Sequence, residues 1–309
     1  MIITKPCAFV VSGGRTGTSY INDFINRKFR DVRSFHEPDN IDSFRPGYLR
    51  NMAQEFGDPL FLFKKVFGQW GLKNLSNQRL AGKITDTEAA EKLYHNRHNF
   101  VEQSDARIFV ETSYNYNGLL DIIPTVFQDY RIVFIIRDPR DWVRSHMNVR
   151  EWYYYSNPNT ILGTRLSAEM VGDEPYASRW QGFSRFEKLC WAWNYLNVNA
   201  VRMLREVHQS MVIRFEDLFD KSNDGETLRQ TIEFITRMES SPEIDYRQEL
   251  SRTVGPSAEY TFPRWPDWDA DMAMQLETIC GEFMEEMGYG EEEEWNRILQ
   301  HTSKAGEEL

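Results

Sequence analysis

Short apolar runs alternate along the chain with segments in which apolar residues recur every three or four positions. This alternation predicts an α/β fold, in which a central parallel sheet is flanked by helices. The apolar runs place the predicted strands at residues 7–12, 31–36, 60–66, 107–112, 131–136 and 210–215. The helical periodicity places the predicted helices at residues 17–28, 87–100, 117–127, 139–150, 184–207, 226–238 and 267–287.

One segment interrupts this rhythm. Residues 151–180, EWYYYSNPNTILGTRLSAEMVGDEPYASRW, are rich in aromatic and turn residues and lie between two predicted helices. A long irregular segment inside a compact domain is usually functional. Because the chain shows no internal repeat and no low-complexity linker, we expect one domain over residues 1–309 with an insert at about 151–183. The acidic stretch EEEEW after Gly290 is expected to form a solvated charged face.

Composition narrows the class of protein. Of the 309 residues, 41% are hydrophobic and 27% are charged, which indicates a folded globular protein. The net charge of −11 argues against nucleic-acid binding, so an anionic ligand must find a local basic site. The three cysteines, Cys7, Cys190 and Cys280, lack metal-ligand spacing and favour a reducing compartment. No apolar run approaches the roughly 20 residues of a membrane span, and the N-terminus is too short for a signal peptide, so we expect a soluble, cytoplasmic protein without a membrane partner.

The stretch FVVSGGRTGTSYI, residues 9–21, resembles a phosphate-binding loop without its lysine. Aligned on Gly17, the consensus G-x-x-x-x-G-K-[ST] has Ser12 for its first glycine and Thr18 for its lysine, which argues against a standard ATPase or GTPase. The loop still has three features of a phosphate-binding loop. Backbone freedom comes from Gly13, Gly14 and Gly17, hydroxyls at a helix N-terminus come from Thr18 and Ser19, and one positive charge comes from Arg15. From this loop alone, a glycine-rich turn that binds nothing is the alternative.

A second strand–turn–helix unit, YRIVFIIRDPRDWVRSHMNVR, follows at residues 130–150. Arg137 stands at the carboxyl end of the predicted strand, where ligands bind in open α/β sheets. Pro139 suits a first helical turn and Asp138 can cap it. Ser145 follows two turns later and could meet the same phosphate as Arg137. The alternative is that Arg137 forms a surface ion pair with a neighbouring aspartate.

Together the two motifs resemble the sulfotransferase family that uses 3′-phosphoadenosine 5′-phosphosulfate (PAPS). In that family a loop of the type [K/R]-[S/T]-G-T-[ST] binds the 5′-phosphosulfate, and R-[N/D]-P-x-D with a following serine binds the 3′-phosphate. The corresponding residues here are Arg15, Thr16, Gly17, Thr18 and Ser19, then Arg137, Asp138, Pro139, Arg140 and Asp141, with Ser145. Looser matches at 190–200, 212–218 and 263–290 extend the resemblance over most of the chain, except the insert.

The resemblance implies a P-loop NTPase-like three-layer sandwich and PAPS as the donor, without a required metal. It implies that Gly13, Gly14 and residues 15–19 bind the donor together with Arg137 and Ser145, and that Arg252 or Arg264, in the region of the C-terminal cofactor loop, could touch the 3′-phosphate. We select Arg264 for the donor site.

Catalysis of sulfuryl transfer requires stabilisation of negative charge and a base for the acceptor hydroxyl. Arg15 can stabilise charge at the bridging oxygen but cannot give up a proton. The segment SFHEPDN, residues 34–40, resembles a Glu-Pro element that supplies a catalytic carboxylate in many carbohydrate and bacterial sulfotransferases. Glu37 is therefore the first candidate base and His36 the second. A turn without a catalytic role is the alternative for this pair.

The expected function is transfer of a sulfuryl group from PAPS to a hydroxyl of a small molecule or glycan. A P-loop nucleotide kinase or other phosphotransferase is one alternative, although we find no triphosphate-binding lysine for it. A catalytically inactive nucleotide-binding interaction module is another. On the acceptor side, Trp152, Tyr153, Tyr154 and Tyr155 could form a platform for the acceptor or could simply pack under a lid. The sequence does not indicate an oligomeric state.

Overall fold

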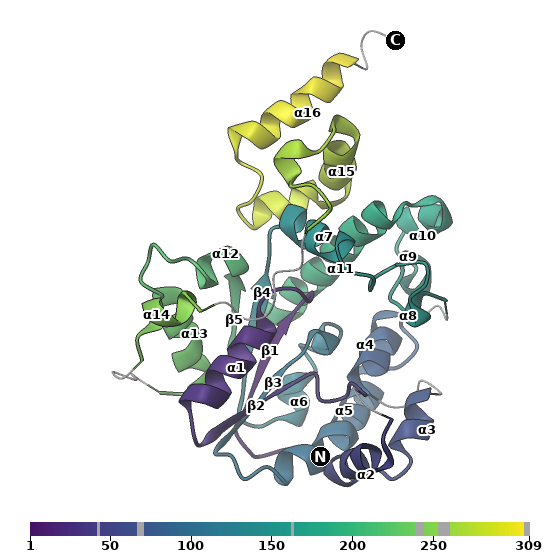
Figure 1. Ribbon diagram of the computed structural model, residues 1–309. Coiled ribbons are helices and arrows are strands. Elements are labelled where there is room, and N and C mark those ends of the chain that lie inside the picture. The colour runs from purple at the N-terminus through teal and green to yellow at the C-terminus, as the bar shows by residue number, and fades with distance from the viewer. Residues whose placement is uncertain (42–43, 67–70, 162–163, 239–243, 253–259, 306–309) are drawn as a thin grey trace. The chain divides into compact units, whose positions relative to one another are not determined.

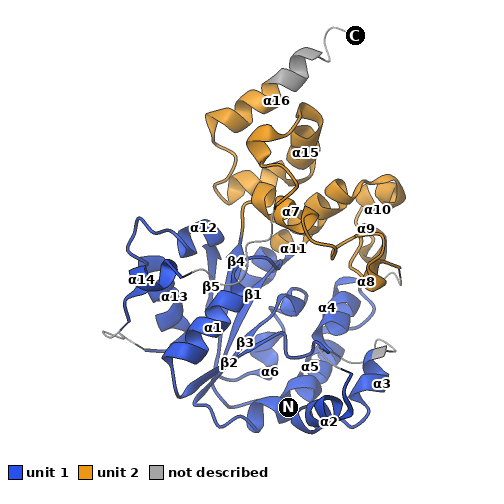
Figure 2. Ribbon diagram, viewed as in Figure 1, with its two compact units in different colours: residues 1–136, 199–254 blue, residues 137–198, 255–309 orange. Residues whose placement is uncertain are grey.

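The computed structural model describes residues 1–41, 44–66, 71–161, 164–238, 244–252 and 260–305. These residues form two compact units, coloured separately in Figure 2. Unit 1 comprises residues 1–136 and 199–254, and unit 2 comprises residues 137–198 and 255–309. Unit 1 contains the sheet, and the described part of unit 2 is built from helices and loops.

The sheet of unit 1 has five parallel strands in the order β2-β3-β1-β4-β5 (Figure 1). The central strand β1, Cys7–Ser12, pairs with β3, Ile108–Thr112, on one side and with β4, Tyr130–Ile136, on the other. The edge strands are β2, Val32–His36, and β5, Ser210–Arg214. A buried apolar strand such as β1, which is covered on both faces, is typical of parallel sheets.

Helices cover both faces of this sheet, because successive side chains of each strand point to opposite faces. On one face, alternate residues such as Val10 and Val133 pack against α1, Thr18–Lys28, and α13, Glu226–Thr236. On the other face, Phe9 contacts Tyr116 and Phe127 at ring-centroid distances of 5.0 and 4.8 Å. The predicted three-layer α/β fold is therefore confirmed for unit 1.

The remaining helices of unit 1 fill the connections between strands. They are α2 (Pro46–Glu55), α3 (Phe61–Val66), α4 (Leu72–Leu80), α5 (Asp86–Glu102), η1 (Tyr114–Tyr116), α6 (Ile123–Val126), α12 (Phe215–Leu218) and α14 (Tyr246–Leu250). The longest of these, α5, begins with a capping box, in which the side chains of Thr85 and Glu88 bind each other's backbone N–H.

Unit 2 has a core rich in tryptophan. Trp142, Trp191, Trp193 and Trp295 are almost completely buried in it. Its helices are α7 (Pro139–Met147), α8 (Pro158–Ile161), α9 (Ala168–Val171), α10 (Tyr176–Arg179), η2 (Trp180–Gly182), α11 (Arg185–Leu204, whose last turns belong to unit 1), η3 (Trp265–Asp267), α15 (Ala270–Glu286) and α16 (Glu293–Ala305). Among the described residues of the whole chain, every helix is too short or too polar to span a bilayer.

The strand predicted at residues 60–66 is wrong, because this run forms the short helix α3. A brief apolar run is compatible with either a strand or a helix. Asp58 decides the outcome here, since its carboxylate accepts hydrogen bonds from the backbone N–H of Leu60 at 3.0 Å and from Lys64 Nζ at 2.6 Å. Phe61 is buried as a result, whereas Phe63 is 62% exposed.

The helix predicted at residues 117–127 is also largely wrong. The chain forms turns after η1, and only α6, Ile123–Val126, is helical there. Pro124 lies in the first turn of α6, the place where a missing backbone N–H is tolerated, so a helix cannot run through it from Asn117.

The EEEEW stretch is only partly the solvated face that we expected. Glu292 is half-exposed but forms an ion pair with the buried Arg140, and Trp295 is 1% exposed. The stretch therefore anchors the start of α16 as well as presenting charge to solvent.

A buried ion cluster holds one side of unit 1 together. Arg97 of α5 is completely buried and donates from Nε and Nη2 to the two carboxylate oxygens of Glu111, both at 2.8 Å. Its Nη2 also donates to Asp39, and Tyr116 Oη donates to Glu111 at 2.8 Å. The other carboxylate oxygen of Asp39 accepts from the backbone N–H of Leu72 at 2.7 Å, at the start of α4.

We predict that Arg97→Met destabilises the protein by about 3–5 kcal/mol, because it leaves the carboxylates of Asp39 and Glu111 buried without their cation. Urea unfolding followed by circular dichroism measures the effect. The control is Arg107→Met, which removes an exposed ion pair with Asp31 and should cost at most about 1 kcal/mol. Equal losses in the two variants would contradict the importance of the buried cluster.

Candidate functional site

The sheet order marks one place on unit 1 as the natural ligand-binding edge. From β1 the chain goes on to β2 at one edge of the sheet, whereas from β4 it goes on to β5 at the other edge. Because these adjacent strands are parallel, with Ser12 beside Ile135, their carboxyl ends lie together where the connections diverge. In open α/β sheets, ligands bind at such a switch point. The glycine-rich loop predicted to bind an anion follows β1 at this point.

The loop turns sharply after β1. Ser12 is buried; its Oγ accepts a hydrogen bond from the backbone N–H of Gly14 at 3.0 Å, and its carbonyl oxygen accepts one from Asn117 Nδ2 at 2.9 Å. Gly14 and Arg15 both have left-handed backbones, with φ of 85° and 57°. A left-handed backbone is unusual for a residue with a side chain and is often found at functional sites. Arg15 is exposed, and Gly13 before it is buried.

Helix α1 begins immediately after the loop and has features that suit an anion. Gly17, at φ 78°, is its N-cap residue and supplies no side-chain cap, and the first turn contains no acidic residue. The N-terminal N–H groups of such a helix attract negative charge. Thr16 Oγ1 is buried and has no hydrogen-bond partner among the described residues, and Thr18 and Ser19 carry hydroxyls into the first turn. These residues fit a phosphate or sulfate group.

Gly17 also meets a packing constraint. A Cβ added at this position would lie 2.6 Å from Cζ of Phe219, which follows α12. The left-handed φ and the aromatic ring therefore both require glycine at this position. The match of Gly17 to the phosphate-loop pattern has a structural reason in this chain.

His36 and Ser19 lie together in unit 1. The Nε2 atom of His36 is 2.9 Å from Ser19 Oγ, and Nδ1 is 2.9 Å from Thr112 Oγ1. Thr112 Oγ1 in turn donates to the carbonyl oxygen of Phe35 at 3.5 Å. We assign the ring from this chain: Nδ1–H donates to Thr112, and Nε2 accepts from the Ser19 hydroxyl. His36 is thus held between the glycine-rich loop and β3.

Glu37 follows at the carboxyl end of β2 with a left-handed φ of 46°. Its backbone N–H donates to the carbonyl oxygen of Thr112 at 3.0 Å, and its carbonyl oxygen accepts from the backbone N–H of Asn40 at 2.9 Å. Asn40 Nδ2 also donates to the Glu37 carboxylate. The second carboxylate oxygen, Oε1, lies 3.9 Å from His36 Nε2. This tight turn fixes the carboxylate beside His36.

The sequence did not point to the residues that support this turn. Asp39, two residues after Glu37, is the residue that Arg97 binds in the buried cluster. Burial raises the pKa of Glu111 above its usual range although Arg97 opposes that shift, and the nearby carboxylates keep Arg97 charged by raising its pKa. A buried arginine between carboxylates far away in sequence leaves no local pattern that could have revealed it.

In unit 2, Arg137 precedes α7 and is partly buried, and its carbonyl oxygen accepts from Trp193 Nε1 at 2.8 Å. Asp138 caps α7 as predicted, since Oδ1 accepts from the backbone N–H of Arg140 at 2.8 Å. Burial raises the pKa of Asp138, although Arg140 acts in the opposite direction. Ser145 lies on the same helix and is 2% exposed.

Arg140 is the central cation of this part of unit 2. It donates to Asp138 and, from Nη1 and Nη2, to Glu292 at 2.8 and 2.7 Å. Its guanidinium also lies 4.4 Å from the ring centroid of Trp265 and 5.2 Å from that of Trp295. The hydrogen bonds from Arg140 lower the pKa of Glu292. Contacts of Arg140 with the C-terminal segment therefore stabilise the turn that contains Arg137.

The insert at about 151–183 contains the short helices α8, α9 and α10 and the η2 turn. Trp152 is 6% exposed and packs edge-on against Trp142 and His146. Tyr153 donates its hydroxyl to the carbonyl oxygen of Leu166 at 2.6 Å, and burial raises its pKa. Tyr155, in contrast, is 79% exposed. For Trp152 and Tyr153 the packing alternative is therefore the one that the structure supports.

The predicted site residues fall in both units. The loop from Gly13 to Ser19, together with His36 and Glu37, belongs to unit 1, and Arg137, Ser145 and Arg264 belong to unit 2. Arg264 is exposed and is the N-cap residue of η3. Arg252, the other candidate of the C-terminal region, donates to Glu249 at 3.2 Å. The described residues contain no group of three or more His, Cys, Asp or Glu that could hold a metal.

Comparisons with known proteins do not establish a family for this chain. No family model matches the sequence, and no curated protein matches it. A sulfotransferase from Alicyclobacillus acidocaldarius is similar in structure with a TM-score of 0.45 and 16% identity over 95% of this chain and 100% of its own. The sulfotransferase domain of the curacin biosynthetic pathway is similar with a TM-score of 0.44 and 14% identity. This similarity covers 98% of this chain and 99% of that domain's chain. Both of these solved structures are sulfotransferases by name.

We predict that Gly17→Ala destabilises the protein by about 1–3 kcal/mol, because the new Cβ meets Phe219 and the left-handed backbone is costly for alanine. Thermal unfolding followed by circular dichroism measures the effect. The matched control is Gly47→Ala in α2, where an added Cβ meets no atom within 4 Å and should be neutral or stabilising by up to about 1 kcal/mol. If Gly17→Ala behaves like this control, the constraint on the loop is not the one described.

Proposed function

We propose that the protein transfers a sulfuryl group from PAPS to a hydroxyl of a small molecule or glycan. The observation that supports this most directly is the loop at the switch point. It joins an exposed arginine, a buried hydroxyl without a partner in the described parts of the chain, and a helix N-terminus without a side-chain cap. Such a loop suits the anionic 5′-phosphosulfate group of the donor.

A second anion-binding segment distinguishes this donor from ATP. Arg137 is the first residue after β4, the strand that pairs with β1. We assign the 3′-phosphate of PAPS to Arg137 and Ser145, because ATP carries no phosphate at that position. Arg264 is a further candidate for this phosphate. The position of the triphosphate-binding lysine of a nucleotide kinase is taken by Thr18, which disfavours that alternative.

In the proposed reaction, the acceptor oxygen forms a bond to sulfur while the bond from sulfur to the bridging oxygen of the donor breaks. The products are the sulfated acceptor and adenosine 3′,5′-bisphosphate. Arg15 stabilises the charge that develops on the bridging oxygen, since its guanidinium stays protonated throughout. This stabilisation matters most in the transition state, so Arg15 contributes to the rate more than to donor binding.

Glu37 is the proposed base that accepts the proton of the acceptor hydroxyl. It is held at the carboxyl end of β2 in a strained turn and lies beside His36. His36 is less suited to this role, because both of its ring nitrogens are engaged by Ser19 and Thr112. We assign His36 to orienting the Ser19 hydroxyl within the donor loop.

The donor assignment is tested by calorimetric titration with adenosine 3′,5′-bisphosphate and with ATP. We expect the bisphosphate to bind more tightly, and to bind without magnesium. Tighter binding of ATP that depends on magnesium would sink the sulfotransferase proposal in favour of a phosphotransferase. Tight bisphosphate binding without sulfate transfer to any of a panel of hydroxylated acceptors would favour an inactive nucleotide-binding module.

Substitution of Arg15 and substitution of Arg137 should change different quantities, the turnover number for Arg15 and the donor affinity for Arg137. Arg15→Ala should lower kcat by about 100-fold or more while changing donor affinity little, because removal of one preorganised transition-state donor has effects of this size. Arg137→Ala should instead weaken donor binding by about tenfold or more, the loss expected when a charged hydrogen bond is removed. Donor titrations and initial rates on the same preparations measure both effects. Unchanged donor affinity in Arg137→Ala would refute its role.

Glu37→Gln should abolish transfer and leave the affinity for adenosine 3′,5′-bisphosphate intact, since the amide keeps the size of the side chain but cannot accept a proton. Asp31→Asn, which alters an exposed carboxylate before β2, is the matched control and should keep full activity. Full activity of Glu37→Gln would shift the base to another residue.

A further inference from the structure

Arg165, in the insert of unit 2, is a buried arginine without a counter-ion. Among the described residues three arginines are buried, namely Arg97, Arg140 and Arg165. Arg97 and Arg140 each donate to two carboxylates. Arg165 is 8% exposed, yet within the described parts of the chain its side chain forms no hydrogen bond and no ion pair. Burial of a charge is costly when no partner offsets the loss of water.

The surroundings of Arg165 hold its guanidinium in one place. The guanidinium carbon lies over the ring of the buried Trp152, 4.7 Å from the ring centroid. The backbone N–H of Arg165 donates to the carbonyl oxygen of Asn159 at 3.2 Å. The next residue, Leu166, accepts from the Tyr153 hydroxyl at 2.6 Å. The Nε atom is enclosed and has no partner among the described residues, but Nη1 and Nη2 are not enclosed in this way. The outer edge of the guanidinium therefore stays accessible.

The group that lies beside Arg165 does not neutralise it. Burial raises the pKa of the Tyr153 phenol, and Arg165 is the charge that acts against this shift. The phenol is therefore neutral at physiological pH, and its proton is already donated to Leu166. The positive charge of Arg165 thus remains uncompensated by the described residues around it.

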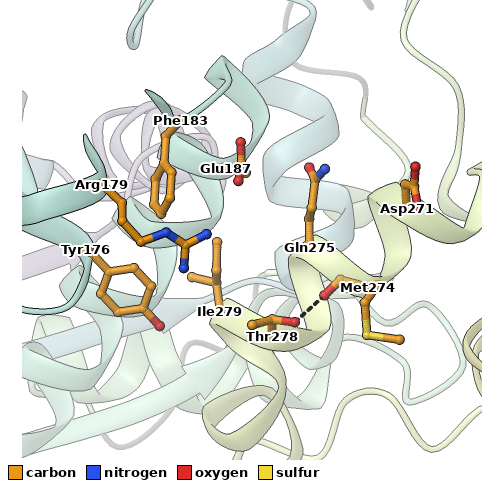
Figure 3. Close-up of a pocket in the computed structure, with 9 residues that line it drawn as sticks. All are labelled: Tyr176, Arg179, Phe183, Glu187, Asp271, Met274, Gln275, Thr278 and Ile279. Atoms are coloured by element: carbon orange, nitrogen blue, oxygen red, sulfur yellow. Dashed lines mark hydrogen bonds between the residues drawn. The ribbon is translucent and has the colours of Figure 1, made fainter. Parts of the chain in front are cut away.

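Arg179 shows how an exposed arginine differs. It lines a pocket of about 240 Å³ whose walls come from α10, the start of α11 and α15 (Figure 3). Its guanidinium carbon lies 5.4 Å from the ring centroid of Phe183, and among the described residues it too has no hydrogen bond or ion pair. Because Arg179 is exposed, water solvates its charge. The two arginines differ in burial, so Arg179 provides a matched control for Arg165.

We propose that Arg165 binds one oxyanion group, a carboxylate or a sulfate ester, of a small organic molecule. The planar edge of the guanidinium carries N–H donors that match two oxygens of such a group. Either group carries a single negative charge, so its pair with Arg165 leaves no net charge buried. Inorganic sulfate carries two negative charges, and one guanidinium would neutralise only one of them. The inference does not depend on the proposed sulfuryl transfer, because binding is measured without a donor.

Saturation-transfer NMR on the whole chain tests the requirement for a charge. Phenylacetate and phenyl sulfate present the two anionic groups on the same ring, and phenylacetamide is the uncharged match of phenylacetate. We expect at least one of the anions to bind at millimolar concentration or below, and the amide to bind at least about tenfold more weakly. The anion that binds more tightly identifies the group that Arg165 recognises. Equal binding of the amide, no binding of either anion, or equally tight binding of inorganic sulfate would overturn the proposal.

Variants locate the binding at Arg165. Arg165→Met should weaken binding of the anion at least about tenfold, and Arg179→Met should bind it as the wild type does. Arg165→Lys keeps the charge but lacks the planar fork, so it should also bind more weakly than the wild type. Binding that survives unchanged in Arg165→Met and Arg165→Lys would place the ligand elsewhere and contradict the assignment.

Thermal unfolding separates ligand binding from a purely structural role. Without ligand, Arg165→Met should keep or raise Tm, because methionine fills the space against Trp152 and removes a buried charge that has no partner among the described residues. A saturating anion should raise the Tm of the wild type and of Arg179→Met, but not that of Arg165→Met. If the ligand-free Tm of Arg165→Met falls well below that of Arg179→Met, Arg165 serves the packing of unit 2 and the proposal fails.

Discussion

Parallel pairing of β1 with β3 and β4 is the constraint from which the candidate site follows. In a parallel sheet all carboxyl ends lie at one edge, so the segments that leave β1, β2 and β3 begin there together. The glycine-rich loop leaves β1, the His36–Glu37 turn leaves β2, and Thr112 ends β3. Contacts of His36 with Ser19 and Thr112 then connect these three strand ends directly.

A buried ion cluster gives this edge its rigidity. Arg97 links Glu111, inside β3, to Asp39, two residues beyond the candidate base. Burial of these charges is costly, and it is tolerated because nearly every hydrogen-bonding position is used, including those of Tyr116 and the backbone N–H of Leu72. A turn anchored in this way can hold Glu37 in a left-handed conformation that would be unfavourable in a free chain.

The parts of the fold that could be predicted are those that depend on short runs of consecutive residues. The run at residues 7–12 is apolar up to Ser12 and is followed by glycines, so both the strand and the loop could be predicted directly. The run at residues 60–66 also begins with four apolar residues but forms a helix, where Asp58 accepts hydrogen bonds from the backbone N–H of Leu60 and from Lys64. The ion pair between Arg140 and Glu292 joins residues far apart in sequence, so the local charge of the EEEEW stretch concealed it. The residues of the cluster around Arg97 are also far apart in sequence, so no local pattern indicated it. The loop and Arg137, in contrast, lie in short motifs that could be recognised.

The loop carries Thr18 at the position of the phosphate-loop lysine and its positive charge at Arg15, which has a consequence for the proposed chemistry. Arginine keeps its proton at any physiological pH, so the loop can stabilise charge but cannot take part in proton transfer. In the proposed reaction the proton goes instead to Glu37, the carboxylate in the strained turn after β2. His36 contacts Ser19 of the loop and lies beside the Glu37 carboxylate, so it can couple the orientation of the loop hydroxyl to the turn that contains Glu37. The proposed reaction thus divides electrostatic stabilisation and proton acceptance between the loop after β1 and the turn after β2, and the buried cluster that binds Asp39 holds that turn in place.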